Sequence, residues 1–167
     1  TCSISGYGST GPLASRKAYD LLIQAESGIA GVTGSPEAPT RVGVSLVDYG
    51  SGLNAYEAIL EAIIARGRTG VGAEIELSMF DAMAELMAVP LLYGKYGEAP
   101  KRVGLKHPAV APYGLFPTSD GTPVLIAIQN DREWRVLAET VMRRPDLADD
   151  PKFATNIARV EHRTETD

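Results

Sequence analysis

The sequence predicts an α/β fold in which a large domain precedes a smaller α+β domain. Three observations carry this prediction. Strand-like runs alternate with helical patterns over residues 1–93, a linker rich in glycine and proline follows at 94–107, and the pattern changes over 108–167. This last region opens with two strand-like runs and continues as helices, which is typical of a small α+β domain.

The elements of the large domain are expected in a regular order. Strands, or extended runs, are expected at residues 1–5, 41–47 and 74–78, and helices at residues 19–28, 53–66 and 79–92. The helix at 53–66 is the clearest, because its apolar residues share one face and glycines end it. Met79, Met83 and Met87 recur at helical spacing, which indicates a packed face rather than a binding device.

The small domain has its own signals after the linker. We expect strands at 113–118 and 124–128 around the turn Ser119-Asp120-Gly121. A helix start signal at Asp131 is followed by apolar residues at helical spacing, and a polar helical region runs from Asp146 onward.

Composition and charge exclude several classes of protein. The chain has 167 residues, of which 44% are hydrophobic, and a net charge of −5, so neither nucleic-acid nor membrane-surface binding is expected. One cysteine suits a reducing, cytoplasmic compartment, and with two histidines it provides no metal-ligand cluster. The sequence shows no membrane span and no signal peptide, and it lacks an initiator methionine. We therefore expect a piece of a longer protein.

Asp48 is the most informative residue for function. It lies between an apolar run and Gly50 and Gly52, where a ligand can approach the backbone closely. The free N–H groups of a following helix favour negative charge in the same space. Such a place suits a carboxylate nucleophile that passes through anionic intermediates. Local sequence alone favours a simpler alternative, in which Asp48 or Ser51 caps the helix.

The run Gly6-Tyr7-Gly8-Ser9-Thr10-Gly11 matches the dinucleotide-binding pattern G-x-G-x-x-G, but its context does not. Pro12 follows the third glycine, where a helix should already be running. No acidic residue closes a second strand about 20 residues further on. NAD or FAD binding is therefore not expected.

Short motifs continue in order along the whole chain. They are Ile4–Pro12, Tyr19–Gly28, Val47–Gly52, Arg66–Gly72, Glu76–Ala82, Ala111–Phe116, Asp120-Gly121, Phe153–Asn156 and Arg159-Val160. Together these motifs resemble the class III CoA-transferases, a family that includes formyl-CoA transferase, carnitine CoA-transferase and the α-methylacyl-CoA racemases. The resemblance implies a Rossmann-like, doubly wound large domain, of which residues 1–93 are the later part. It also implies an interlocked homodimer.

The resemblance implies that Asp48 attacks an acyl-CoA thioester and forms a mixed anhydride. The released CoA thiolate then converts the anhydride to an aspartyl-CoA thioester, and a small carboxylic acid takes over the CoA. Acyl-CoA is thus a substrate, with no permanently bound cofactor or metal. We expect Gly50, Ser51 and Gly52 to provide N–H groups for the oxyanions. Acid-to-acid transfer of this kind requires a dry site.

Five further residues match positions that contact CoA in the family. They are Lys17, Ala18, Tyr19, Asp20 and Met79. A lysine suits a phosphate or the adenine end of CoA, and a tyrosine can pack on the pantetheine arm. The alternatives are a surface lysine, a half-buried tyrosine and, for Met79, a place in the core.

Two departures from the family pattern bear on the reaction. The racemases carry a histidine base where this chain has Tyr19, and tyrosine, with a reference pKa of about 10, is a poor base at neutral pH. The mobile glycine-rich loop of formyl-CoA transferase is replaced by Lys106–Val110, which disfavours formyl transfer to oxalate. His107 in this loop is a candidate contact for the acceptor carboxylate, against a purely structural role.

Three functions therefore stay open at this point. The first is an acyl-CoA:carboxylate CoA-transferase. The second is a racemase, or an isomerase that transfers CoA within one molecule, on the same fold. The third is a non-catalytic CoA-binding or scaffold fragment, in which Asp48 contributes only to the stability of a helix cap.

Overall fold

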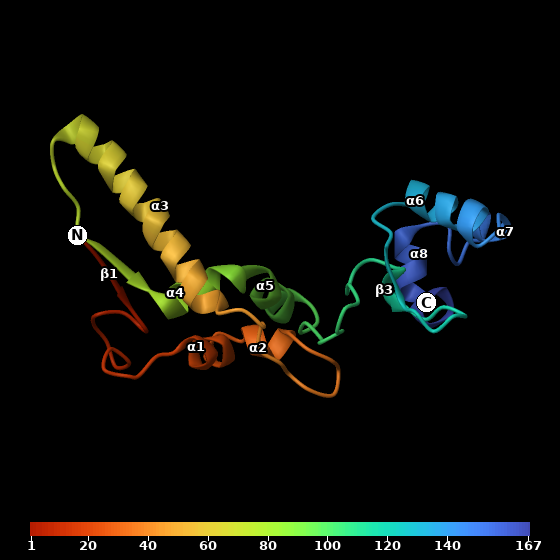
Figure 1. Cartoon of the computed structure of the whole chain (residues 1–167), viewed down its shortest axis with the longest axis horizontal. Coiled ribbons are helices and arrows are strands. Elements are labelled where there is room, and N and C mark those ends of the chain that lie inside the picture. The colour runs from red at the N-terminus through yellow and green to blue at the C-terminus, as the bar shows by residue number, and fades with distance from the viewer. The chain divides into compact units, whose positions relative to one another are not determined.

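The computed structural model describes residues 1–167, which form two compact units, Thr1–Arg102 and Val103–Asp167 (Figure 1). Both units combine helices with a pair of strands. No helix in either unit has the length and apolar character needed to span a bilayer.

The first unit contains two parallel strands with helices between and after them. Its elements are β1 (Cys2–Ser5), α1 (Asp20–Glu26), α2 (Ile29–Val32), α3 (Leu46–Thr69), β2 (Ile75–Ser78), α4 (Met79–Leu86) and α5 (Ala88–Tyr96). Cys2 pairs with Ile75 and Ser5 with Ser78, so both strands end at the same edge. The strands expected at 1–5 and 74–78 and the helix expected at 19–28 are confirmed. The helix expected at 79–92 is two helices that meet at Met87.

Helix α3 corrects the prediction around Asp48. No strand forms at 41–47, and the helix begins at Leu46 rather than at Leu53. The expected turn at Gly50 and Gly52 therefore lies inside the helix. Packing explains Gly50, because a Cβ atom there would lie only 2.9 Å from Met83 Cε. The glycine lets α3 approach α4 closely rather than bend the chain.

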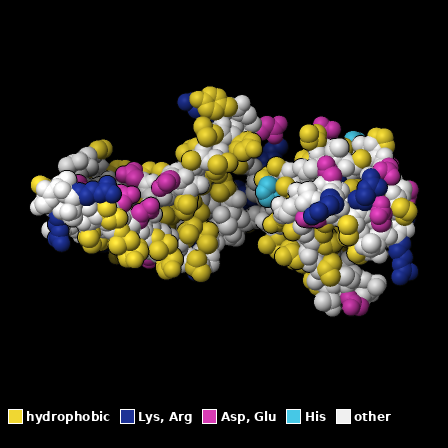
Figure 2. Space-filling view, turned by 90° about the horizontal axis from the view of Figure 1, so that it is seen from above, with side chains coloured by type: hydrophobic (Ala, Val, Ile, Leu, Met, Phe, Trp, Pro, Cys, Tyr) yellow, Lys and Arg dark blue, Asp and Glu magenta, His cyan; other side chains and the backbone are white.

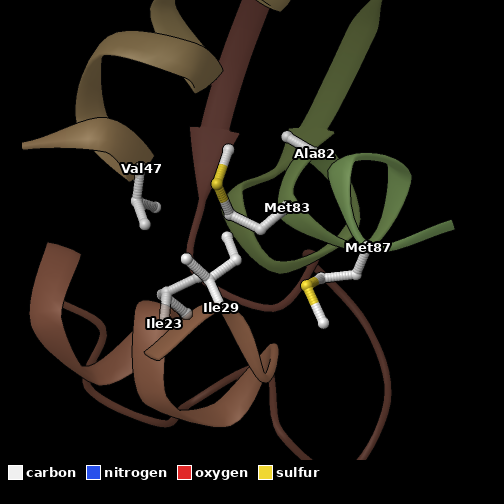
Figure 3. Packing of buried hydrophobic residues seen from close by; sticks show 6 residues of the cluster. All are labelled: Ile23, Ile29, Val47, Ala82, Met83 and Met87. Atoms are coloured by element: carbon white, nitrogen blue, oxygen red, sulfur yellow. The ribbon is translucent and has the colours of Figure 1, made fainter. Parts of the chain in front are cut away.

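The core of the first unit joins α1, α2, the start of α3 and α4 (Figure 3). Its buried members are Ile23, Ile29, Val47, Ala82, Met83 and Met87. Met79 is partly buried and packs against this cluster, so the methionine face of α4 is a packed face, as predicted. Val47 is completely buried, which anchors the first turn of α3 beside the ends of the strands.

The second unit is built on an antiparallel pair of strands. Its elements are β3 (Tyr113–Phe116), β4 (Val124–Ala127), α6 (Asp131–Val136), the π-helix η1 (Leu137–Val141), α7 (Asp146–Asp149), α8 (Asn156–Glu161) and α9 (Arg163–Thr166). Tyr113 pairs with Ala127 and Phe116 with Val124, which confirms the two strands expected around the turn. The helix expected from Asp131 is confirmed, with the Asn130 side chain accepting a hydrogen bond from the Glu133 N–H group.

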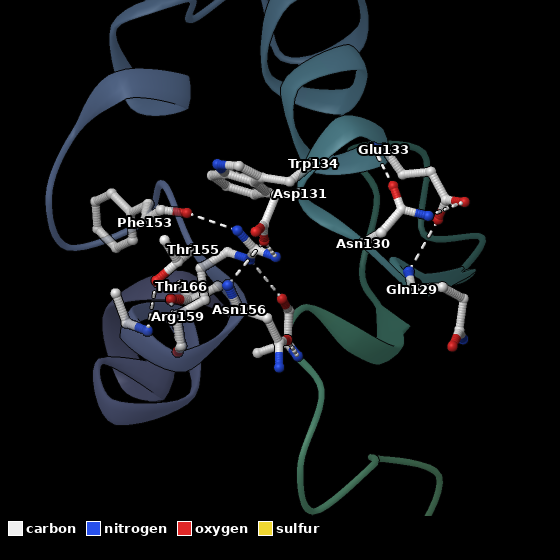
Figure 4. Close-up of polar contacts among 12 residues, drawn as sticks. Gln129, Asn130, Asp131, Glu133, Trp134, Phe153, Thr155, Asn156, Arg159 and Thr166 are labelled. Carbon is white, nitrogen blue, oxygen red and sulfur yellow. Dashed lines mark hydrogen bonds and ion pairs between the residues drawn. The ribbon is translucent and has the colours of Figure 1, made fainter.

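A buried arginine organises the core of the second unit (Figure 4). Arg159 of α8 is 0% exposed. Its guanidinium donates to Ala111 O at 2.7 Å, to Phe153 O at 2.7 Å and to Asp131 Oδ1 at 2.9 Å. It also lies 5.1 Å from the centroid of the Trp134 ring, which is itself 2% exposed. One side chain thus joins Ala111, which lies two residues before β3, to the start of α6 and to the segment before α8.

Candidate active site at the start of helix α3

Asp48 lies in the first turn of α3, at the end of the helix that packs against α1. Its side chain is exposed, and its carboxylate makes no hydrogen bond or ion pair in the structure. The N-cap residue of α3 is Ser45, so the alternative in which Asp48 or Ser51 caps the helix is wrong. The carboxylate of Asp48 is therefore free to meet a ligand.

The free N–H groups near Asp48 differ from those expected. Gly50, Ser51 and Gly52 lie inside α3, where N–H groups donate to the carbonyl oxygens four residues earlier. In the first turn, the N–H group of Leu46 donates to Val44 O, whereas that of Asp48 has no partner. The N–H group available to an oxyanion is thus the one that belongs to Asp48 itself.

Ser51 is notable for a different reason. It is 1% exposed, and its hydroxyl oxygen has no hydrogen-bond partner. Its side chain faces the interior of the unit, away from the exposed carboxylate of Asp48.

The segment Lys17–Asp20 lies beside the end of β1. A Cβ atom on Gly6 would lie 2.2 Å from Ala18 Cβ, so only glycine permits this approach. Tyr19 is 66% exposed at the N-cap position of α1, and Lys17 is also exposed. Asp20 accepts a hydrogen bond from the Val47 N–H group at 2.8 Å. The segment expected to contact CoA and the start of α3 are thus neighbours, at the carboxyl ends of parallel strands, where α/β proteins bind ligands.

The glycine-rich loop at residues 6–12 adjoins the same edge. Phe80 N–H donates to Gly6 O, so the loop meets the start of α4. Tyr7 Oη donates to Glu26 Oε2 at 2.6 Å, and this hydrogen bond raises the pKa of Tyr7 above its usual value. Arg16 pairs with the same carboxylate. The next helix begins only at Asp20, so the loop lacks the helix that a dinucleotide fingerprint requires.

His107 belongs to the second unit, in a turn where it forms a bridge with Val110. Its Nδ1 accepts a hydrogen bond from the Ala109 N–H group at 3.1 Å. In the neutral ring this leaves the proton on Nε2, which is then a donor. Arg163 Nη2 donates to His107 O at 2.8 Å and to Val110 O at 2.9 Å. The turn is therefore held firmly at both of its ends.

Two other features bear on what the structure can bind. No group of three or more histidine, cysteine, aspartate or glutamate side chains is arranged to hold a metal ion. A pocket of about 300 Å³ opens between α3 and the beginnings of the strands, and it is lined partly by Cys2, Ile59 and Ile75. None of the predicted site residues lines this pocket.

The chain belongs to the CoA-transferase family III, whose model matches residues 1–167. Among its relatives, an acetyl-CoA:oxalate CoA-transferase of Acetobacter aceti is 44% identical over 95% of this chain and 41% of the relative. A succinate–glutarate CoA-transferase of Agrobacterium fabrum is 37% identical over 98% of this chain and 41% of the relative. The chain thus spans about two fifths of the length of these relatives.

Solved structures share the fold of this chain. A CAIB/BAIF family protein from Brucella suis is 42% identical, with a TM-score of 0.77 over 98% of this chain and 43% of that protein. Rv3272 from Mycobacterium tuberculosis is 28% identical, with a TM-score of 0.81 over 98% of this chain and 42% of that protein. The mixed helix-and-strand fold is therefore the fold of this family.

Proposed function

We propose that this chain carries the nucleophile of an acyl-CoA:carboxylate CoA-transferase and that Asp48 is that nucleophile. The observation that carries the proposal is the free carboxylate of Asp48 on the first turn of α3. A carboxylate without a cationic or hydrogen-bonded partner keeps its lone pairs available for attack. The matching family supports CoA transfer as the type of reaction.

The reaction follows from the chemistry of a carboxylate and a thioester. An Asp48 oxygen attacks the thioester carbonyl carbon, the C–S bond breaks, and the CoA thiolate leaves, which gives a mixed anhydride. The thiolate then attacks the aspartyl carbonyl carbon and releases the donor acid as a carboxylate. The acceptor carboxylate next attacks the aspartyl thioester, and CoA thiolate attacks the acyl carbonyl of the new anhydride. The new acyl-CoA leaves and Asp48 is regenerated.

The start of α3 supports the anionic intermediates of this reaction. Each tetrahedral intermediate carries an oxyanion, and the unpaired N–H group of Asp48 lies at the positive end of the helix dipole. Lys17 and Tyr19 are exposed on the neighbouring segment, which suits contacts with the phosphates and the pantetheine arm of CoA. Met79 is partly buried and packs against the core. We propose that its main role is packing and that only the exposed part of its side chain contacts CoA.

The acceptor is proposed to be a small dicarboxylic acid. The relatives at 44% and 37% identity are named for oxalate and for succinate and glutarate. We further propose that the complete protein has a Rossmann-like large domain and is a cytoplasmic homodimer. Apolar side chains of α3 remain exposed, among them Tyr56 at 62% and Ile64 at 59%, and hydrophobic atoms are prominent on the surface in Figure 2. Such a surface suits burial against further protein.

Trapping of the intermediate tests this proposal directly. The complete polypeptide is incubated with a panel of acyl-CoA donors and treated with borohydride, and the peptide that contains Asp48 is analysed by mass spectrometry. We expect a donor-dependent change of mass confined to Asp48 and absent in Asp48→Asn. An unmodified Asp48 in protein shown to bind CoA would contradict the nucleophile assignment.

The other two functions make different predictions in the same experiment. A racemase exchanges the α-proton of acyl-CoA with deuterated solvent, whereas simple CoA transfer does not. A non-catalytic CoA-binding protein binds CoA, but none of the donors modifies Asp48 or yields a new acyl-CoA. Oligomeric state is measured separately, by light scattering of the complete polypeptide, and a monomer would contradict the homodimer.

A pair of substitutions at His107 separates contact with the acceptor from support of the turn. Asparagine provides an oxygen near Nδ1 for the Ala109 N–H group but removes the Nε2 donor. Glutamine places its amide near Nε2, where its NH₂ group can donate, and leaves the Ala109 N–H group without an acceptor. If His107 contacts the acceptor, we expect His107→Asn to raise the KM for the acid about 10-fold and to leave thermal unfolding unchanged.

His107→Gln gives the complementary result. It is expected to keep the KM for the acid near that of the parent while lowering the melting temperature, because the Ala109 N–H group loses its acceptor. An unchanged KM for the acid in His107→Asn would leave His107 with a structural role alone.

A further inference from the structure

The first turn of α3 is capped by a side chain from another helix. Ser45, at the N-cap position, makes no side-chain hydrogen bond. Asp20, the first residue of α1, instead accepts a hydrogen bond from the Val47 N–H group through Oδ2 at 2.8 Å, across 27 residues of sequence. A carboxylate in this place satisfies a free N–H group and interacts favourably with the helix dipole. Asp20 therefore fixes the helix one residue before Asp48.

Gln24, one turn further along α1, extends this contact to the segment before α3. Its side chain is 0% exposed. Its Nε2 donates to Asp20 Oδ1 at 2.8 Å, and its Oε1 accepts from the Val42 N–H group at 2.8 Å. A buried amide with both ends paired adopts one orientation. Helix α1 thus holds the chain at two points, Val42 and Val47, immediately before Asp48.

These hydrogen bonds have a fixed direction. The Asp20 carboxylate only accepts, so Gln24 must turn its NH₂ group toward Asp20 and its oxygen toward the Val42 N–H group. A reversed amide would place two donors together at Val42 and two acceptors together at Asp20. The two side chains therefore act as one unit, and exchanging the functional group of either one alone sets two donors or two acceptors against each other.

We propose that Asp20 and Gln24 are positioning residues that orient Asp48 for attack on the thioester, an inference that rests on the proposed function of Asp48. Val47 is completely buried and capped by Asp20, so the adjacent Asp48 backbone is fixed while its side chain faces solvent. Asp20 uses its two oxygens for this task rather than for CoA. A displacement of the nucleophile by about 1 Å lowers the reaction rate about 10²-fold. Loss of the Asp20 cap is therefore expected to slow the reaction even though Asp48 itself is unchanged.

An exchange of the two functional groups tests the proposal. Asp20→Asn alone sets an NH₂ group against the Gln24 NH₂ group or against the Val47 N–H group. Gln24→Glu alone sets two carboxylates against each other. The double variant Asp20→Asn/Gln24→Glu restores every partner, because the introduced amide accepts from Val47 N–H and donates to the introduced carboxylate, which also accepts from Val42 N–H.

The readouts are kcat for CoA transfer at saturating donor and the hydrogen-exchange protection of the Val47 amide, measured in the complete polypeptide. We expect each single variant to lower kcat about 10- to 100-fold and to lower the protection. The double variant should recover both, with kcat within about threefold of the parent. If the double variant recovers the protection of the Val47 amide but not kcat, the positioning role is contradicted, and the loss of kcat is due to the missing charge of Asp20. Parent-like kcat in the single variants would also contradict the positioning role.

One control variant and one comparison with Asp48→Asn distinguish the positioning role from the proposed function. Asp146→Asn makes the same chemical change at an exposed ion pair in the second unit and should leave kcat unchanged. Retained transfer in Asp48→Asn would overturn the proposed function itself, and the inference with it. Loss of transfer in Asp48→Asn together with parent-like single variants would overturn only the positioning role.

Discussion

Replacement of Asp48 by asparagine is expected to lower kcat at least about 10³-fold while the protein stays folded. Asparagine keeps the size of the side chain but cannot form the anhydride, so covalent transfer stops. Because Asp48 is exposed and unpaired, its removal costs only its interaction with the helix dipole, at most about 1 kcal/mol of unfolding free energy. Steady-state kinetics and thermal unfolding of the complete polypeptide measure the two effects.

Asp48→Glu is the matched control for this prediction. It retains the carboxylate but moves it by one methylene group, so we expect activity to fall about 10²-fold and to remain well above that of Asp48→Asn. A parent-like kcat in Asp48→Asn would contradict the nucleophile. Equal activity of the two variants would show that the carboxylate itself is not used.

The sequence predicts a nucleophile at Asp48 but not the helix turn that presents it. Gly50 and Gly52 were interpreted as a turn because glycine usually disfavours a helix interior. The structure uses Gly50 for the close approach of α3 to α4, a tertiary contact with Met83 that local sequence does not encode. The helix therefore begins at Leu46, and the N–H groups expected for an oxyanion lie inside it.

The cap at the start of α3 shows the same limit more clearly. Asp20 belongs to a segment that the family resemblance links to CoA, and Gln24 lies in the motif Tyr19–Gly28 without a predicted role of its own. Their partners Val42 and Val47 lie 18 and 27 residues away in sequence. Periodicity predicts which face of α1 is buried, but it cannot predict which distant N–H group a buried amide meets. By contrast, the residue pattern of a strand is local, and four of the five expected strands form, at 1–5, 74–78, 113–118 and 124–128, whereas the one expected at 41–47 does not.

Arg159 in the second unit has a structural role that could not be predicted from the sequence. It lies in the polar region expected to be helical from Asp146 onward, yet it is 0% exposed. Its three hydrogen-bond acceptors come from Ala111, Asp131 and Phe153, which are 48, 28 and 6 residues away. Buried arginine is stable only with such complete pairing, so its removal should affect the unit as a whole.

Arg159→Met is accordingly expected to lower the unfolding free energy of the second unit by about 3–5 kcal/mol. Methionine fills part of the volume, but two backbone carbonyl groups lose the Arg159 donor, and the Asp131 carboxylate keeps only the Asn156 N–H group. Trp134 is the single tryptophan of the chain and lies beside Arg159 in the core, so its fluorescence reports the unfolding of this unit alone. Chemical denaturation followed at Trp134 should show the shift.

Two conservative variants, Arg159→Lys and Asp131→Asn, distinguish the contribution of the Arg159 hydrogen bonds to stability from that of its charge. Arg159→Lys keeps the cation but cannot reach three acceptors in one plane, so a loss of about 1–3 kcal/mol is expected. Asp131→Asn keeps an oxygen acceptor on a side chain that is 53% exposed, so a loss below about 1 kcal/mol is expected. A Trp134 transition unchanged in Arg159→Met would show that packing, not the guanidinium, holds this core. Losses that decrease in the order Arg159→Met, Arg159→Lys, Asp131→Asn would instead identify the planar guanidinium of Arg159 as the group that joins α8 to α6 and to Ala111.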